Sequence, residues 1–239
     1  SCKVEADRFM LKARHGRLLV TILALALLAA LARWLEDSPT PHNPSSADRQ
    51  SETSSFDYYL IALSWSPTWC EDNPRDQEQC DSRGFGFILH GLWPQHERGG
   101  GPQHCAAGKG PDHVTRYRAL AFMPSRNLIE HEWRAHGSCS GLDATSYFEL
   151  ADRAFASVRI PPLLQAGVKP PAMTANAVRS AFVDANPGMQ EDMLGVSCDG
   201  RDLSEVRICV DKELNPRSCG RGVRMSCPRE RTIRIPASR

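Results

Sequence analysis

Two short segments of the chain concentrate side chains that can move protons near neutral pH. The first, FILHGLWP, contains His90, with a glycine directly after it and Trp93 three residues on. The second, HEWRAHGSC, contains His131, Glu132 and His136. Because imidazoles titrate at about pH 6.5, two of them can serve as general base and general acid without a metal. The two segments therefore predict a proton-transfer site.

The spacing within the second segment argues against a zinc centre. On a helix, Glu132 and His136 share a face, where the carboxylate would hold the imidazole tautomer and raise its pKa. A zinc protease places its two histidines at i and i+4, whereas His131 and His136 are five residues apart, about 140° around the helix. We therefore expect no metal in this site.

The N-terminal region is typical of an export signal. Residues 18–32 form an uncharged apolar run that ends in Ala-Leu-Ala and follows three basic residues. This pattern predicts a signal peptide over residues 1–32, in which residues 1–9 are an over-extension before Met10. An uncleaved membrane anchor is one alternative, but a membrane-spanning helix needs about 20 apolar residues and this run has 15. A buried core helix is the other alternative.

Export would change both the net charge and the cysteine chemistry. The whole chain has 29 basic and 28 acidic residues, which excludes a polybasic nucleic-acid arm. Cleavage after Ala32 leaves 24 basic and 26 acidic residues, a net charge of −2. The mature chain must therefore contact a polyanion through a local site rather than by bulk charge. It also leaves eight cysteines, an even number that predicts four disulfides. Zinc ligation is the alternative, but no two cysteines have the C-x-x-C spacing.

The elements that must position these segments follow from composition and periodicity. Residues 33–55 predict a disordered linker, followed by one domain over 56–235 and a tail over 236–239. The order of elements favours an α+β fold, a central antiparallel sheet with helices packed on it. Expected strands cover 56–66, 84–93, 195–198, 205–210 and 232–236, and expected helices cover 113–123, 125–136, 145–158 and 174–185.

The two segments resemble the two active-site signatures of the ribonuclease T2 family. FDYYLIALSWSPTWC also resembles the family's opening strand, most of all in its bacterial periplasmic members, and the resemblance covers residues 56–228. It implies a disulfide-reinforced α+β fold and metal-independent cleavage of single-stranded RNA with little base preference. The implied products are 2′,3′-cyclic phosphates, which are then hydrolysed to 3′-phosphates. No cofactor is implied.

Carried over by motif position, the resemblance assigns roles to four residues. His136 is the implied general base and His90 the implied general acid, although sequence alone does not separate the two. Glu132 would have an orienting or stabilising role, and His131 would bind phosphate.

Three further positions bear on substrate binding and on departures from the family. Trp93 is a candidate stacking platform for a base, with core packing as the alternative. Gln95 stands near the place where fungal members often carry an Asp for base recognition. Ala135 stands where the family commonly has a Lys, so the site is expected to lack one cation.

The resemblance also suggests disulfide pairs that spacing leaves open, since eight cysteines allow 105 connectivities. It supports Cys105–Cys139 most. The implied pairs are Cys70–Cys80, Cys105–Cys139, Cys198–Cys227 and Cys209–Cys219.

The expected partner is single-stranded RNA and not DNA. The protein is expected to be a monomer in the periplasm or outside the cell. Membrane attachment is expected only if the signal is not cleaved. The alternative function is a catalytically weakened secreted protein on the same fold that binds RNA or is cytotoxic. The histidines outside the motifs are expected on loops and at the surface, and these are His96, His104 and His113.

Overall fold

The computed structural model describes residues 55–81, 83–105, 108–227 and 231–238. The expected signal peptide, and the linker except for Ser55, lie outside the described residues. Among the residues described, no helix has the length and apolar character needed to cross a membrane.

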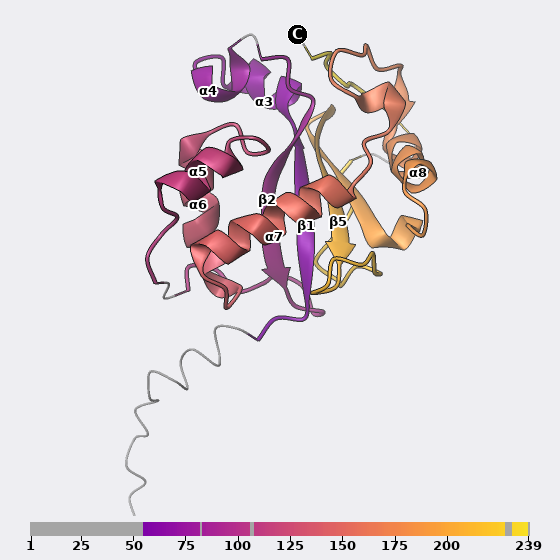
Figure 1. The fold of residues 1–239 in the computed structure, drawn as a ribbon. Coiled ribbons are helices and arrows are strands. Elements are labelled where there is room, and N and C mark those ends of the chain that lie inside the picture. The colour runs from indigo at the N-terminus through magenta and orange to yellow at the C-terminus, as the bar shows by residue number, and fades with distance from the viewer. Residues whose placement is uncertain (1–54, 82, 106–107, 228–230, 239) are drawn as a thin grey trace, which may run out of the picture. The chain divides into compact units, whose positions relative to one another are not determined.

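A four-stranded antiparallel sheet forms the centre of the domain (Figure 1). Its strand order is β2-β1-β5-β4, so the first strand of the domain pairs with one that follows about 140 residues later. A second, two-stranded sheet joins β3 to β6. The strands are β1 (Tyr58–Trp65), β2 (Phe87–Gln95), β3 (Met173–Thr174), β4 (Leu194–Asp199), β5 (Asp202–Val210) and β6 (Thr232–Ile233).

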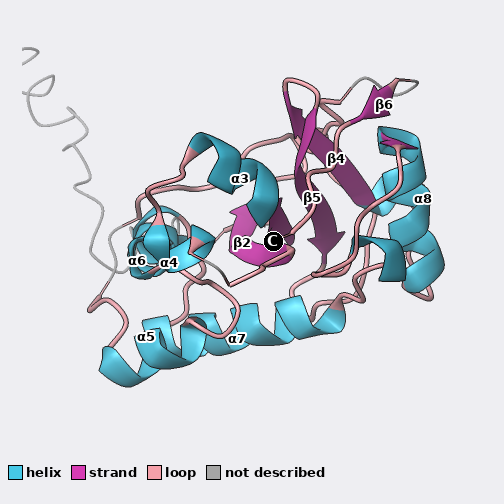
Figure 2. Ribbon diagram, turned by 90° about the horizontal axis from the view of Figure 1, so that it is seen from above, coloured by secondary structure: helices cyan, strands magenta, loops and turns pink. Residues whose placement is uncertain are grey.

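Helices cover one side of this sheet. Figure 2 shows α7 lying along the sheet, and α8 lies beside β4, which it contacts. The α-helices are α3 (Ser66–Asp72), α4 (Gln77–Cys80), α5 (His113–Ala119), α6 (Arg126–Ala135), α7 (Ala144–Ser157) and α8 (Ala175–Ala185). Three 3₁₀ turns are η1 (Gly137–Cys139), η2 (Pro162–Leu164) and η3 (Glu191–Met193).

The central strand β1 divides its side chains between two apolar clusters. Ile61 and Leu63 face the helices and belong to the main core. Tyr58 and Leu60 face the opposite side, where they form a smaller cluster that Trp93 packs against. Because strand residues alternate between faces, a strand with apolar side chains on both faces must be buried on both. The second face of the sheet is thus partly covered, and it carries the residues described below.

The structure confirms the predicted α+β fold with a central antiparallel sheet. The predicted helix over 125–136 corresponds to α6, and the expected Ser125 cap accepts a hydrogen bond from the Leu128 amide. Helices α3 and α4 were not predicted. Each is at most seven residues long, too short for a periodic signal, and α3 has a proline, Pro67, in its first turn, where proline is tolerated.

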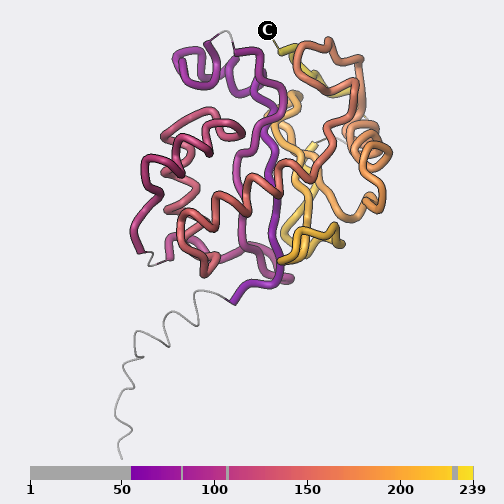
Figure 3. Tube along the Cα trace, viewed as in Figure 1, coloured from indigo at the N-terminus to yellow at the C-terminus, as the bar shows by residue number. Residues whose placement is uncertain are grey.

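The C-terminal segment returns to the end of β1, as the tube in Figure 3 shows. The Pro236 carbonyl accepts a hydrogen bond of 2.9 Å from the Trp65 indole, and the Ser238 hydroxyl accepts one of 2.7 Å from the Gly167 amide. The residues expected to form a tail are therefore attached to the domain as far as Ser238.

Candidate active site

A β-bulge in β2 sets the direction of His90. In the pairing of β2 with β1, Ala62 is opposite Gly91 and Leu63 is opposite Leu89, so His90 is the extra residue. A bulge leaves its extra residue without a cross-strand partner and re-aims the neighbouring side chains. Leu89 packs in the main core, whereas His90 is half-buried on the opposite face, where it meets side chains from β5 and α6.

Gly91 leaves room for a hydrogen bond that crosses directly over it. The Trp93 indole N–H donates to Glu132 Oε2 at 2.7 Å. A Cβ atom on Gly91 would lie 2.0 Å from that carboxylate oxygen and 2.2 Å from the indole nitrogen. Only glycine therefore allows β2 and α6 to approach this closely.

The second histidine lies where α6 ends. The helix ends at Ala135, and His136 takes a non-helical conformation with φ −129° and ψ −50°. The Trp93 ring contacts both imidazoles, with centroid distances of 5.2 Å to His90 and 5.0 Å to His136. Residues from the two motifs, 39 to 46 positions apart, thus meet in one site.

The contacts of Glu132 differ from those expected. The sequence predicted that this carboxylate faces His136, but its oxygens face Trp93 and His90, with Oε1 3.6 Å from His90 Nε2. The prediction assumed a helix that continues through residue 136, and the helix ends one residue earlier. Glu132 is fully buried, and among the described residues neither its Oε1 nor His136 Nδ1 has a hydrogen-bond partner.

Strand β5 contributes two residues that the sequence analysis missed. His90 Nδ1 lies 2.5 Å from Glu205 Oε1. The other Glu205 oxygen accepts from the Arg207 guanidinium, at 2.8 Å from Nε and 2.7 Å from Nη2. This guanidinium lies 5.6 Å from the centroid of the Trp93 ring. The available signal was the alternation in EVRICV, which places two charged residues on one face of an otherwise apolar strand.

These contacts shift the pKa values of His90 and its two carboxylate neighbours. Burial favours neutral His90, but the hydrogen bond to Glu205 and the charges of both carboxylates outweigh it and raise the pKa. Burial also opposes ionisation of Glu205, yet His90 and Arg207 together lower its pKa to about 2. For Glu132, burial prevails over the attraction of His90 and the Trp93 hydrogen bond and raises the pKa to about 7.

The pKa of His136 shifts the other way. Burial, reinforced by the positive charges of His131, His90 and His104, lowers the pKa of His136 to about 4. Burial, followed by the charges of His90, Arg134 and His104, also lowers the pKa of His131. The pKa values of the two imidazoles are therefore displaced in opposite directions, so His90 holds its proton to higher pH than His136 does.

His104 is closer to this site than the sequence suggested. Its side chain is exposed, as expected for a loop residue, but its backbone N–H donates to the Ala135 carbonyl at 3.0 Å. Its φ of 53° is unusual for a residue with a side chain. The disulfide between Cys105 and Cys139 fixes the loop here. Ala135 itself is 3% exposed, so the position where the family commonly has Lys is covered.

The remaining predicted residues lie around this centre. His131 is exposed on α6, next to Glu132. Gln95 is half-buried, and its side-chain amide donates to the neighbouring Pro94 carbonyl at 3.0 Å. Within the described part of the chain, no group of three or more His, Cys, Asp or Glu could hold a metal ion. The disulfides are Cys70–Cys80, Cys105–Cys139, Cys198–Cys227 and Cys209–Cys219.

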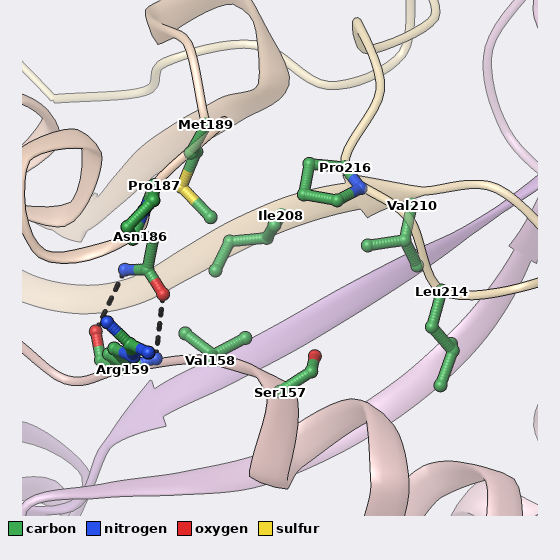
Figure 4. Close-up of a pocket in the computed structure, with 10 residues that line it drawn as sticks. All are labelled: Ser157, Val158, Arg159, Asn186, Pro187, Met189, Ile208, Val210, Leu214 and Pro216. Atoms are coloured by element: carbon green, nitrogen blue, oxygen red, sulfur yellow. Dashed lines mark hydrogen bonds between the residues drawn. The ribbon is translucent and has the colours of Figure 1, made fainter.

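A pocket of about 270 Å³ lies on the other face of the sheet (Figure 4). Ile208 and Val210 line it from β5, on the side opposite Arg207. The Asn186 side chain projects into it but is fully engaged, because it bonds both the N–H and the carbonyl of Arg159. The pocket therefore offers no reactive group to the site around His90.

Comparison with known proteins agrees with this geometry. The model of the ribonuclease T2 family matches residues 56–219. A ribonuclease of Aeromonas hydrophila is 37% identical over 177 residues, which cover 72% of this chain and 80% of that protein. A probable ribonuclease of Haemophilus influenzae is 29% identical over 71% of this chain and 63% of its own length.

The fold is also similar to that of a solved structure. An RNase-related protein from Calystegia sepium has a TM-score of 0.62 and 23% identity, covering 77% of this chain and 99% of its own. Both motifs, with His90, Glu132 and His136, lie within the matched segment. The chain belongs to the ribonuclease T2 family.

Proposed function

We propose that this protein is an endoribonuclease that cleaves single-stranded RNA by metal-independent transesterification. One observation carries the proposal, namely that two imidazoles contacting the same indole ring have pKa values displaced in opposite directions. Groups whose pKa values are pushed apart in this way are suited to the roles of acid and base.

The displaced pKa values support His136 as the base and His90 as the acid. Neutral His136 removes the proton of the ribose 2′-OH, and the 2′ oxygen attacks phosphorus. The bond from phosphorus to the 5′ oxygen breaks, and charged His90 gives its proton to that leaving oxygen. The product is a 2′,3′-cyclic phosphate. In its hydrolysis the roles reverse, because water loses a proton to His90 and the 2′ oxygen regains one from His136.

The neighbouring residues support these two. We assign Glu132 to orienting His90 and stabilising the phosphorane, since its Oε1 is buried, unbonded within the described residues, and 3.6 Å from His90 Nε2. Exposed His131 is assigned to phosphate binding. Trp93 contacts both imidazoles and the Arg207 guanidinium, so its contacts favour positioning the histidines over base stacking.

The surroundings support low base specificity and export. The Gln95 amide is bonded to a backbone carbonyl rather than presented to a base, so we propose little discrimination among bases. Four disulfides favour a periplasmic or extracellular location, which the expected signal peptide would provide. We propose that the mature protein is a monomer. A weakened RNA-binding protein on this fold is disfavoured because His90, Glu132 and His136 occur together.

The test is incubation of the purified mature protein with yeast RNA and with single-stranded DNA in EDTA. RNA should be degraded to fragments with 2′,3′-cyclic and 3′-phosphate ends, while DNA, which lacks the 2′-OH, should stay intact. A His136→Ala preparation made in parallel controls for contaminating nucleases. Loss of activity on chelation, with recovery on adding a divalent metal, would contradict the mechanism.

A further inference from the structure

The strand residue Glu205 lies outside both motifs. Within the described residues, its carboxylate makes the closest polar contact with the His90 imidazole, closer than that of Glu132. The side chain of Glu205 is 11% exposed, and Glu205 follows His90 by 115 residues in the sequence. We propose that Glu205 is the positioning residue that holds His90 in its charged, acid form, and that Arg207 fixes the Glu205 carboxylate through its other oxygen. The proposal rests on the proposed ribonuclease function and deepens it.

The geometry assigns separate tasks to the two nitrogens of His90. Nδ1 lies 2.5 Å from Glu205 Oε1, within charge-assisted hydrogen-bond distance. Nε2 faces the site, 3.6 Å from Glu132 Oε1. A carboxylate that accepts from Nδ1–H fixes the ring and leaves the Nε2 proton to be transferred. When Nε2–H passes its proton to the leaving 5′ oxygen, His90 becomes neutral, and Nδ1–H stays bonded to Glu205.

The sheet register explains how Arg207 reaches this pair. Across the strands, Gly91, Ala62, Arg207 and Gly195 form one row. Apart from Arg207, the members of this row have a methyl group or no side chain. The guanidinium can therefore lie beside the Trp93 ring and bond Glu205 two residues earlier on β5.

The charged and titratable groups facing His90 come from β5, from α6 and from the residue after α6. Strand β5 provides Glu205 and Arg207, and α6 provides Glu132. The imidazoles of His131 and His136, on and after α6, repel a charged His90. The pKa of Glu132 is about 7, so this carboxyl is partly neutral near pH 7, whereas the pKa of Glu205 is about 2. Glu205 is therefore the constant counter-charge of His90, and Glu132 is not.

The experiment compares the pH profile of kcat/KM on a dinucleotide for the wild type and Glu205→Gln. Glutamine keeps the size and hydrogen-bonding capacity of the side chain but removes its charge, so His90 should lose its proton at lower pH. We expect the alkaline limb to move down by about one pH unit, which corresponds to about a tenfold loss of rate at pH values well above the His90 pKa. Arg207→Gln should move the same limb upward, because Arg207 lowers the pKa of His90.

Two further variants separate this role from a merely structural one. Glu205→Asp keeps the charge and should restore part of the alkaline limb. Glu213→Gln makes the same chemical change at an exposed loop position and should leave the profile unchanged. If Glu205→Gln does not fold, as circular dichroism would show, the Asp and Arg207 variants still carry the test.

An NMR titration of the histidines without substrate distinguishes the two proposals, with His90→Asn used for assignment. A wild type that is inactive on RNA would overturn the proposed function, whereas the pKa of His90 in the wild type and Glu205→Gln would still report on the pair. An active wild type whose His90 pKa and alkaline limb do not change in Glu205→Gln would overturn the role of Glu205.

Discussion

At the scale of single residues, His90 and His136 carry the same side chain in different surroundings. A carboxylate bonded to one ring nitrogen raises the pKa of His90, whereas burial among other imidazoles lowers that of His136. The proposed mechanism requires neutral His136 and charged His90. Activity should therefore fall as the pH drops through about 4 and fall again as the pH rises through the His90 pKa, above its ordinary value.

The kcat/KM of a dinucleotide measured against pH checks this bell-shaped dependence. His90→Ala and His136→Ala should each lower kcat/KM by at least ~100-fold, the low end for removing a general acid or base. The residual activity of His136→Ala should lack the acid limb, and that of His90→Ala the alkaline limb. A near-wild-type rate for either variant would remove that residue from the mechanism.

The sequence pointed to residues that the structure brings together, but it did not predict their contacts. His90, Glu132 and His136 stand out because each lies in a contiguous motif of eight or nine residues. Glu205 was missed because its partner is 115 residues away and because no local pattern distinguishes a functional carboxylate from a surface one. Pairing of this kind depends on which strands meet, and that depends on the fold.

At the scale of elements, the contact between β2 and α6 has no space for a side chain at residue 91. Gly91→Ala would force apart the indole and carboxylate groups that lie 2.0 to 2.2 Å from the added Cβ. Breaking the Trp93–Glu132 hydrogen bond leaves a buried polar group unsatisfied, at a cost of about 1–3 kcal/mol. We expect a loss of kcat/KM of more than about tenfold with only a modest fall in Tm.

Gly108→Ala is the matched control, because a Cβ there meets nothing within 4 Å and its φ is not in the left-handed region. Its Tm and kcat/KM should equal those of the wild type. Equal kcat/KM values for Gly91→Ala and Gly108→Ala would mean that the bulge tolerates a side chain and that the Trp93–Glu132 bond does not matter.

The elements themselves were predictable where a periodic pattern was long enough. The helix that bears Glu132 was predicted to within one residue at each end because a capping serine and a glycine bound it. The position of its last residue nevertheless matters, since His136 lies just beyond the helix in a non-helical conformation. An uncertainty of one residue, ordinary for helix ends, was enough to assign the wrong partner to Glu132.

At the scale of the whole molecule, strand order could not be derived from the chain. The sequence indicates an antiparallel sheet but not that β1 pairs with β5 or that β2 lies at an edge. The edge position explains how Pro94 fits in β2, because a proline lacks the N–H that a second neighbouring strand would need. The same order places His90 and Glu205 on strands that flank β1, close enough to bond across it.

The four disulfides link different elements, and they should differ in what they do for the site. Cys105–Cys139 closes a separation of 34 residues, and its cysteines lie one residue after His104 and three residues after His136, whereas Cys198–Cys227 closes a similar separation of 29. The second bond lies at β4, on the sheet edge opposite β2. Chain entropy predicts that replacing either pair by alanine lowers the free energy of unfolding by about 4 kcal/mol.

Activity should distinguish the two double variants even though their stabilities are similar. Without Cys105–Cys139, the loop bearing His104 and the turn after His136 lose their covalent link, so kcat/KM should fall several-fold at temperatures well below the Tm. The Cys198–Cys227 double variant should keep wild-type kcat/KM under those conditions. Urea unfolding measures the free energy of unfolding, and dinucleotide kinetics at about 15–20 °C measure kcat/KM. Equal kcat/KM values would show that the other contacts of η1 hold His136 in place without the disulfide.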